Sequence, residues 1–329
     1  MSSGERGIRL WLRRQDRRSH NPNNLRKIKE RIAGRGFFLF TLLPLGVLLA
    51  VVVALVARTW PILQVVTPWE ILSGQTWKPF QGLFGMFPFI AGTFWVTLVA
   101  MVLAVPPCLL SAIYLAEYAR PRTREAAKPL LDLLAAIPSV VYGVWGLVAI
   151  VPLVEWLSPQ VSRGLGFLPF LRSSNPTGFS ILAGGIVLAV MIAPFIIAVT
   201  FEVLRSVPAG GREASLAIGA TRWQTIKYAV LPPSRAGIFA GVVFGMSRAL
   251  GETMAVLMVV GNVSKVPSSI FDPAYPLPAL IANNYGEMMS IPLYDSALLG
   301  AALVLLLVVL FFNIISTLVL RQIVGRKQI

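Results

Sequence analysis

The sequence predicts an all-α polytopic membrane protein with six transmembrane helices. Hydrophobic residues make up 56% of its 329 residues and charged residues only 13%, whereas charged residues approach a quarter of a soluble domain. The mean hydropathy is +0.74. Six apolar stretches are each long enough to cross about 30 Å of hydrocarbon as a helix that rises about 1.5 Å per residue. These observations exclude a soluble fold.

The apolar stretches also define the domain organisation. We place the six spans at residues 37–57, 88–116, 130–154, 179–204, 236–262 and 294–320. Residues 1–35 form a basic arm that we expect to be disordered, because they are rich in Arg, Asn and Ser. Residues 36–87 hold the first span and an outer interfacial segment, 88–320 form the core, and 321–329 form a tail.

The basic residues orient the chain in the membrane. Arg and Lys are concentrated in four places: before the first span, between the second and third, between the fourth and fifth, and after the last. The opposite loops contain only Arg58, Lys78, Arg163, Arg172 and Lys265. By the positive-inside rule, both termini and the loop 205–235 are cytoplasmic. This distribution accounts for the net charge of +15 without nucleic acid.

Residue counts exclude several kinds of chemistry. Cys108 is the only cysteine and His20 the only histidine, so a disulfide within the chain, a Cys/His metal site and a Cys-His nucleophile pair are not expected. No Gly-Lys-Ser/Thr occurs, so the chain lacks a Walker-type phosphate loop. The sequence therefore predicts no catalytic residue, metal or cofactor, and any ATP would be hydrolysed by another subunit.

A proline interrupts the third predicted span. Pro138 is followed by Ser139, Tyr142, Gly143 and Gly146. Backbone groups freed by a break in the membrane need partners or a water-lined cavity, which makes Ser139 and Tyr142 candidates for lining a substrate passage. The alternative is an ordinary membrane proline that only bends the helix.

A charged pair lies within the fifth predicted span. Arg248 and Glu252 are four residues apart and would share one helix face. A lone charge at the centre of a span costs about 2.5–3.5 kcal/mol on insertion scales. Either the two charges neutralise each other within packed helices, or Arg248 offers a planar fork to a passing oxyanion that Glu252 positions or releases.

The loop between the fourth and fifth spans is predicted to contain two short helices. Glu213 is expected in the first turn of the first helix, where a carboxylate complements the helix dipole, and Gly219 can take the left-handed conformation that ends a helix. Thr221 and Gln224 have the spacing of a capping box, and Pro232-Pro233 would close the second helix.

Two sets of residues carry a family resemblance. The order Glu213-Ala214, Gly219 and Leu231-Pro232 resembles the EAA loop of permease subunits in bacterial ABC importers, although Ala229 stands where that family often has isoleucine. Residues 136–147 and 248–256 closely resemble the C-type permease subunit of the high-affinity phosphate (Pst) importer. The resemblance covers about 88–320 and implies the six-helix, MetI-like permease fold of type I ABC importers.

The resemblance also implies a function and partners. The chain would be a non-catalytic permease subunit that translocates inorganic phosphate across the bacterial cytoplasmic membrane, surrounded by membrane lipid. It would pair with an A-type phosphate permease subunit, an ATPase dimer and an extracytoplasmic phosphate-binding protein. The implied passage residues are Arg248, Glu252, Ser139 and Tyr142, and the implied ATPase-coupling residues are Glu213, Ala214, Gly219, Leu231 and Pro232.

Three other functions are compatible with parts of this pattern. A sulfate or molybdate permease would share the loop. An ion-coupled secondary transporter, with Glu252 as proton carrier, would show inverted repeats and would leave the loop without a role. An intramembrane enzyme would need a catalytic constellation, which one His, one Cys and one Arg-Glu pair do not provide.

Overall fold

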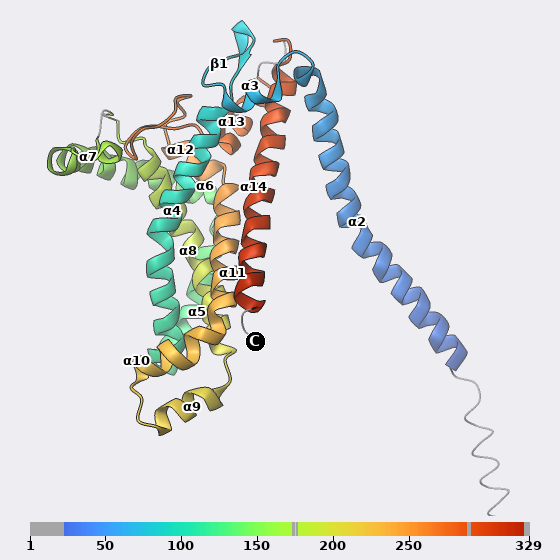
Figure 1. Ribbon diagram of the computed structural model, residues 1–329, viewed down its shortest axis with the longest axis vertical. Coiled ribbons are helices and arrows are strands. Elements are labelled where there is room, and N and C mark those ends of the chain that lie inside the picture. Colours follow the sequence, from blue (N-terminus) through green and yellow to red (C-terminus); the bar gives the residue numbers. More distant parts are fainter. Residues whose placement is uncertain (1–22, 173–174, 176, 288–290, 326–329) are drawn as a thin grey trace, which may run out of the picture. The chain divides into compact units, whose positions relative to one another are not determined.

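The computed structural model describes residues 23–172, 175, 177–287 and 291–325. The chain divides into two compact units, Met1–Ala57 and Arg58–Ile329, and each is described by itself. Helix α2 (Asn23–Leu63) forms the described part of the first unit and ends in the second (Figure 1).

Helix α2 corrects the prediction for the basic arm. Residues 23–35 are helical instead of disordered, and the remaining residues of the predicted arm, 1–22, lie outside the described part of the chain. Lys29, Glu30, Arg31 and Ala33 are good helix formers, so a helix that the apolar span nucleates extends into them at little cost. Within the first unit the apolar side chains of α2 are mostly exposed, as suits a helix surrounded by lipid.

Helices account for nearly all the regular structure of the second unit. They are α3 (Pro68–Ser73), α4 (Phe87–Ile113), α5 (Pro121–Ala136), α6 (Ser139–Trp145), α7 (Val151–Leu165), α8 (Ile181–Arg205), α9 (Ala209–Ala217), α10 (Arg222–Thr225), α11 (Leu231–Leu250), α12 (Met254–Val259), α13 (Leu277–Asn284) and α14 (Tyr294–Gly325). The strands β1 (Trp77–Lys78) and β2 (Leu83–Phe84) pair antiparallel in a short hairpin. Wider π-helical turns continue α4, α6 and α10 over Tyr114–Tyr118, Gly146–Ile150 and Ile226–Val230.

Within the part of the chain that the structure describes, six helices are long and apolar enough to cross a membrane, which confirms the predicted number. They are Lys29–Leu63, Phe87–Tyr118, Ser139–Gly164, Ile181–Arg205, Arg222–Leu250 and Tyr294–Gln322. The predicted positions of the third and fifth spans are wrong, since the structure has them at 139–164 and 222–250 instead of 130–154 and 236–262. The third span begins at Ser139 because Pro138, which lacks an N–H, separates it from α5. The fifth span ends at Leu250 instead of residue 262, because the chain turns at 251–253 before α12.

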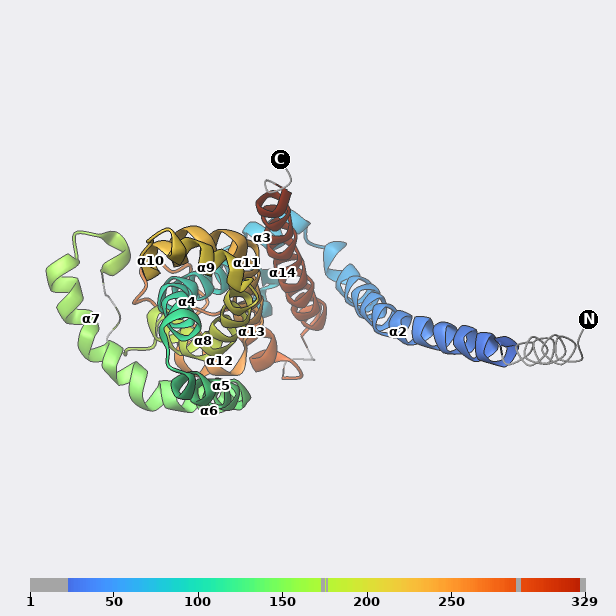
Figure 2. The ribbon, with the colours of Figure 1, turned by 90° about the horizontal axis from the view of Figure 1, so that it is seen from below.

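Helix α8 lies at the centre of the second unit, beside α4, α11 and α12 (Figure 2). Small residues bring its neighbours close. Cβ atoms added at Gly237, Gly241 and Gly245 of α11 would lie 2.5, 3.0 and 2.6 Å from side-chain atoms of α8. This spacing of four residues is the small-residue pattern by which membrane helices pack closely.

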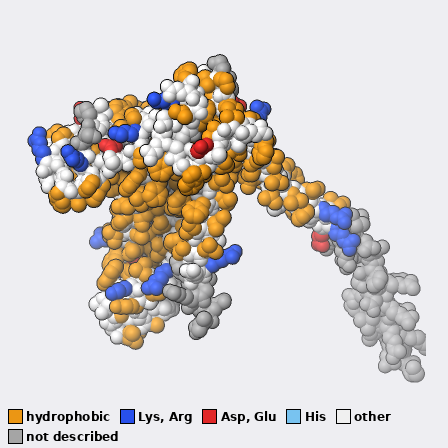
Figure 3. All heavy atoms as spheres, turned by 45° about the horizontal axis from the view of Figure 1, so that its top comes forward, with side chains coloured by type: hydrophobic (Ala, Val, Ile, Leu, Met, Phe, Trp, Pro, Cys, Tyr) orange, Lys and Arg blue, Asp and Glu red, His pale blue; other side chains and the backbone are white. Residues whose placement is uncertain are grey.

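The second unit has an apolar body between two polar ends. Helices α9 and α10 lie at one end, and the β1–β2 hairpin, α3 and α13 lie at the other (Figure 1). Hydrophobic side chains cover the sides of the helices, and basic side chains gather toward the ends (Figure 3). The surface is that of a bundle embedded in a bilayer.

Candidate functional site

Two helix breaks flank the packed helices α6 and α12 in the second unit. One separates α5 from α6 at residues 137–138, and the other separates α11 from α12 at residues 251–253. Helix α6 packs along α12. A Cβ on Gly143 would lie 2.7 Å from Met258 Sδ, and one on Gly146 would lie 2.4 Å from Val187 Cγ2. The small residues after Pro138 therefore permit the close packing that joins the two breaks.

Tyr142 stabilises the first break. Its hydroxyl donates a 2.9 Å hydrogen bond to the Leu134 carbonyl. In a continuous helix this carbonyl would accept a hydrogen bond from residue 138, but Pro138 has no N–H to donate. The Tyr142 side chain is buried. Ser139 is half-buried and occupies the first position of α6. Both predicted passage residues lie at the break, and the Tyr142 hydroxyl is engaged in holding it.

Arg248 lies in the last turn of α11 and is exposed. Its guanidinium carbon lies 4.2 Å from the centre of the Phe195 ring of α8, within the range of a cation–π contact. The Phe195 ring, which the sequence analysis did not identify, in turn lies 6.2 Å from the Phe244 ring.

Glu252 faces different neighbours from Arg248. Its Oε1 accepts a 3.3 Å hydrogen bond from the Ala255 N–H at the start of α12. The carboxylate lines a small pocket together with Thr93 and Thr97 of α4, both of which are buried.

The predicted geometry of the Arg248–Glu252 pair is wrong. The two residues do not share a helix face, because α11 ends at Leu250 and the N–H groups of Gly251 and Glu252 bond to carbonyls only three residues back. Gly251 is a poor helix former, which favours the end of α11 at this point. Among the described residues, ion pairs join only Lys128 to Glu202 and Arg212 to Glu117. Arg248 and Glu252 therefore form no direct ion pair with each other.

The second region of interest is the loop that α9 and α10 form. Gly219 has a φ of +85°, which confirms the left-handed conformation expected of it. The Thr221 hydroxyl accepts from the Gln224 N–H at 3.3 Å, and Gln224 Oε1 accepts from the Thr221 N–H at 2.8 Å, so the predicted capping box is present. Leu216 and Ile218 are 49% and 86% exposed and form an exposed apolar surface.

Two details of this loop differ from the prediction. Glu213 lies beyond the first turn, because α9 begins at Ala209 after Pro208; Glu213 and Ala214 are both exposed. Leu231-Pro232 does not lie at a helix end, because the helix from Arg222 continues to Leu250. A π-turn directs the Leu231 N–H to the Ile226 carbonyl, and the two prolines, which have no N–H, occupy the positions that follow.

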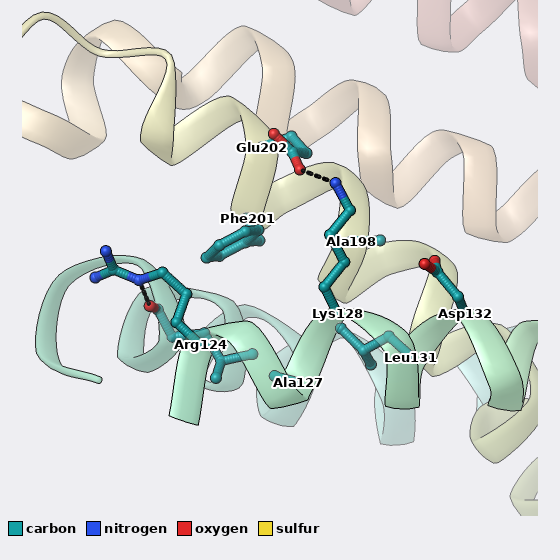
Figure 4. Close-up of a pocket in the computed structure, with 9 residues that line it drawn as sticks. Arg124, Ala127, Lys128, Leu131, Asp132, Ala198, Phe201 and Glu202 are labelled. Carbon is teal, nitrogen blue, oxygen red and sulfur yellow. Dashed lines mark hydrogen bonds and ion pairs between the residues drawn. The ribbon is translucent and has the colours of Figure 1, made fainter. Parts of the chain in front are cut away.

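Two arginines near this loop connect separate elements, which the sequence analysis did not predict. Arg212 donates to Glu117 at the end of the second span. Arg124 of α5, which is labelled in Figure 4, donates to the carbonyls of Leu115, Ala116 and Ala119. The sequence showed both arginines only as members of the basic loops. The contact of Arg212 with Glu117, 95 positions away, leaves no local pattern.

Comparison with protein families places most of the second unit in one of them. Residues 108–328 match the family described as binding-protein-dependent transport system inner membrane component. The matched region includes the helix breaks, Arg248, Glu252 and the α9–α10 loop.

Curated relatives share most of the chain. The phosphate transport system permease protein PstC of Pasteurella multocida is 37% identical over 300 residues, which cover 89% of this chain and 92% of that protein. The probable ABC transporter permease protein YqgH of Bacillus subtilis is 37% identical over 266 residues, which cover 80% of each. The PstC of Xylella fastidiosa is 37% identical over 256 residues, which cover 77% of this chain and 78% of that protein.

A solved structure shares the fold. A chain in the crystal structure of a bacterial alginate ABC transporter, in complex with its alginate pentasaccharide-bound periplasmic protein, superposes with a TM-score of 0.60. The match is 18% identical and covers 91% of this chain and 98% of that one. The helix breaks, the matched family and these relatives together show that the chain belongs to the binding-protein-dependent transport system inner membrane components, in the group that contains the PstC permease proteins.

Proposed function

We propose that the chain is the transmembrane permease subunit of an ATP-driven importer of inorganic phosphate in the bacterial cytoplasmic membrane. The relatives named as phosphate permeases support the substrate. The observation that carries the proposal is the state of Arg248. Among the described residues its guanidinium has an aromatic neighbour but no hydrogen-bond or ion-pair partner, so its donors are available to an anion.

Arg248 is suited to bind a tetrahedral oxyanion. A guanidinium stays charged and presents N–H donors in a planar fork that matches two oxygens of a phosphate. The guanidinium carbon lies over the Phe195 ring, 4.2 Å from its centre, and an aromatic ring occupies none of the N–H donors as a hydrogen-bond acceptor in the described contacts. Stacking of this kind restricts the side chain before the anion arrives, so less entropy is lost on binding.

The surrounding residues keep this binding weak and directional. Glu252 lies near the second break as a fixed negative charge, which limits how strongly the region holds an anion and so favours release. Tyr142 holds the first break through its bond to the Leu134 carbonyl, and Ser139 lies at the same break. Passage between two permease subunits requires such a site to form and dissolve as the helices move.

The coupling loop connects this chain to its energy source. Leu216 and Ile218 of the α9 end, with Gly219, would dock onto a separate ATPase dimer that hydrolyses ATP. The homologous A-type permease subunit would complete the passage, and an extracytoplasmic phosphate-binding protein would deliver the anion at the opposite end. The concentration of basic residues in the α9 end and its flanking loops supports a cytoplasmic location for that end and both termini.

Other oxyanions and other energy sources are distinguishable from this proposal. Sulfate and molybdate could use the same guanidinium, so an excess of each should compete with labelled phosphate only if the passage accepts them. A secondary transporter would need no α9 docking surface, and the Glu252 carboxylate would have to exchange protons.

The experiment compares Arg248→Gln with Arg235→Gln, which removes an exposed charge near the start of the same helix. Phosphate uptake is measured in vesicles, and assembly is measured by co-purification of the subunits. A hydrogen bond to a charged group contributes about 1.5–3 kcal/mol, so Arg248→Gln should reduce uptake roughly 10- to 150-fold while the complex assembles. Arg235→Gln should transport normally. Normal uptake by Arg248→Gln would remove Arg248 from the passage.

A further inference from the structure

A half-buried ion pair joins the coupling loop to the end of the second span. Arg212 lies in α9, and Glu117 lies in the π-turn that continues α4. Nη2 of Arg212 lies 2.8 Å from Glu117 Oε1, and Nε lies 3.2 Å from the same oxygen. The two side chains are 22% and 13% exposed.

The same guanidinium holds a third element. Nη2 of Arg212 donates to the Leu204 carbonyl at 2.7 Å, and Nη1 donates to the Val207 carbonyl. These carbonyls lie in the last turn of α8 and just after it. Arg212 therefore connects α9, α8 and the end of α4 through one rigid, planar group, which a lysine could not reproduce.

The stability of α4 does not explain Glu117. A carboxylate near the C-terminal end of a helix opposes the helix dipole. The carbonyls at that end are already satisfied by Arg124, which donates to three of them. The ion pair with Arg212 accounts for a carboxylate at this position.

The other ion pair of the described residues provides a contrast. Lys128 of α5 and Glu202 of α8 lie 3.4 Å apart and are 67% and 61% exposed (Figure 4). Exposed pairs of long side chains contribute little. The Arg212–Glu117 pair is shielded from water and has additional hydrogen bonds, so it constrains its elements more strongly.

We propose that the Arg212–Glu117 pair is the joint through which movement of α9 reaches the second span. From Glu117 the continuous helix α4 leads to Thr93 and Thr97, which line the pocket that contains Glu252. A shift of α9 would thus move the wall of the Glu252 pocket. This inference rests on the proposed function, because it presumes that α9 receives motion from an ATPase.

The selective variant is Glu117→Ala. Arg212 keeps its bonds to Leu204 and Val207 in this variant, so α9 remains attached to α8 and only the link to α4 is lost. Glu117→Gln retains a hydrogen-bond acceptor without the charge, and Glu202→Ala is the matched control on the exposed pair. Phosphate transported per ATP hydrolysed is measured on the complete assembled complex in proteoliposomes.

The expected order of coupling is unmodified, then Glu117→Gln, then Glu117→Ala. Glu117→Ala should transport at least about fivefold less phosphate per ATP, within the usual range of coupling between sites, with ATPase activity retained. Glu202→Ala should match the unmodified complex. Unchanged coupling in Glu117→Ala would overturn the proposal. Failure of both Glu117 variants to assemble would overturn it too, because a joint that only transmits motion is not needed for assembly. Absence of phosphate uptake by the unmodified complex would instead refute the proposed function.

Discussion

Substitution of Gly146 by alanine tests whether close packing at the helix breaks positions the site. The added Cβ would lie 2.4 Å from Val187 Cγ2 and 2.9 Å from Val259 Cγ1. Ordinary contacts between carbon atoms are about 3.5–4.0 Å, so the π-turn at 146–150 would have to move by about 1 Å away from α8.

The magnitude follows from two opposed terms. Inserting a methyl group into a packed interior costs about 1–3 kcal/mol, and alanine gains up to about 1 kcal/mol over glycine in helix propensity. Gly146→Ala should therefore lower the free energy of unfolding by about 1–2 kcal/mol. Phosphate uptake should also fall, because the displaced turn directly follows α6, which contains Ser139 and Tyr142.

A rescue and a control make the assay specific. The thermal midpoint of the purified complex is measured for Gly146→Ala, for Val187→Ala and for the double variant. In the double variant the nearest Val187 atom is its Cβ at 3.6 Å, an ordinary contact, so the two changes should be less than additive by about 0.5 kcal/mol or more. Gly164→Ala, where no atom lies within 4 Å, should not destabilise the protein. Additive effects, or a Gly146→Ala variant as stable as Gly164→Ala, would refute the reasoning.

Three further predictions concern single residues. Gly219→Val should reduce phosphate transported per ATP, because the φ of +85° at this position costs a non-glycine residue about 1–2 kcal/mol or more. Gly210→Val, at a helical position with open space around it, should keep the normal amount of phosphate transported per ATP. Equal values in the two variants would contradict the prediction for Gly219. Phe195→Leu should raise the phosphate KM of uptake with little effect on the maximal rate, whereas Phe195→Tyr, which keeps an aromatic ring, should have the KM of the unmodified protein. An unchanged KM in Phe195→Leu would show that stacking does not order Arg248. Cys108, which is 2% exposed, should resist maleimide in the folded complex and react after denaturation. Fast labelling of the native complex would show that the packing of α4 against α8 does not enclose Cys108.

Much of the fold could be predicted because membrane insertion imposes strong local rules. Apolar runs of span length identified the six crossings, and the spacing of Thr221 and Gln224 correctly predicted a capping box. Gly219 was identified because a helix end that turns sharply requires a left-handed residue. Each of these features depends on residues that are close together in the sequence.

The errors arose where a single residue ends a helix within an apolar run. Apolar residues resume after both Pro138 and Gly251, so the third span was begun too early and the fifth was ended too late. The second error placed Glu252 on the same helix face as Arg248. The glycine pattern at 237, 241 and 245 could have indicated that α11 packs closely on another helix near Arg248, but only the structure shows that Phe195 is the neighbour.

The Arg212–Glu117 pair illustrates what local patterns cannot reveal. The basic residues of the loops satisfy the positive-inside rule as a group, and nothing nearby in the sequence distinguishes Arg212 from Arg205 or Arg222. Its role becomes visible only when the ends of α4 and α8 are brought beside α9.

Reconstitution into liposomes tests the central claim that this chain is a passage driven by a separate ATPase. Labelled orthophosphate uptake is compared between the chain alone, under a sodium or pH gradient, and the complete complex with both permeases, the ATPase, the binding protein and ATP. We expect accumulation only in the complete complex, and loss of that accumulation when ATP is withheld. Accumulation by the chain alone under an ion gradient would contradict the claim.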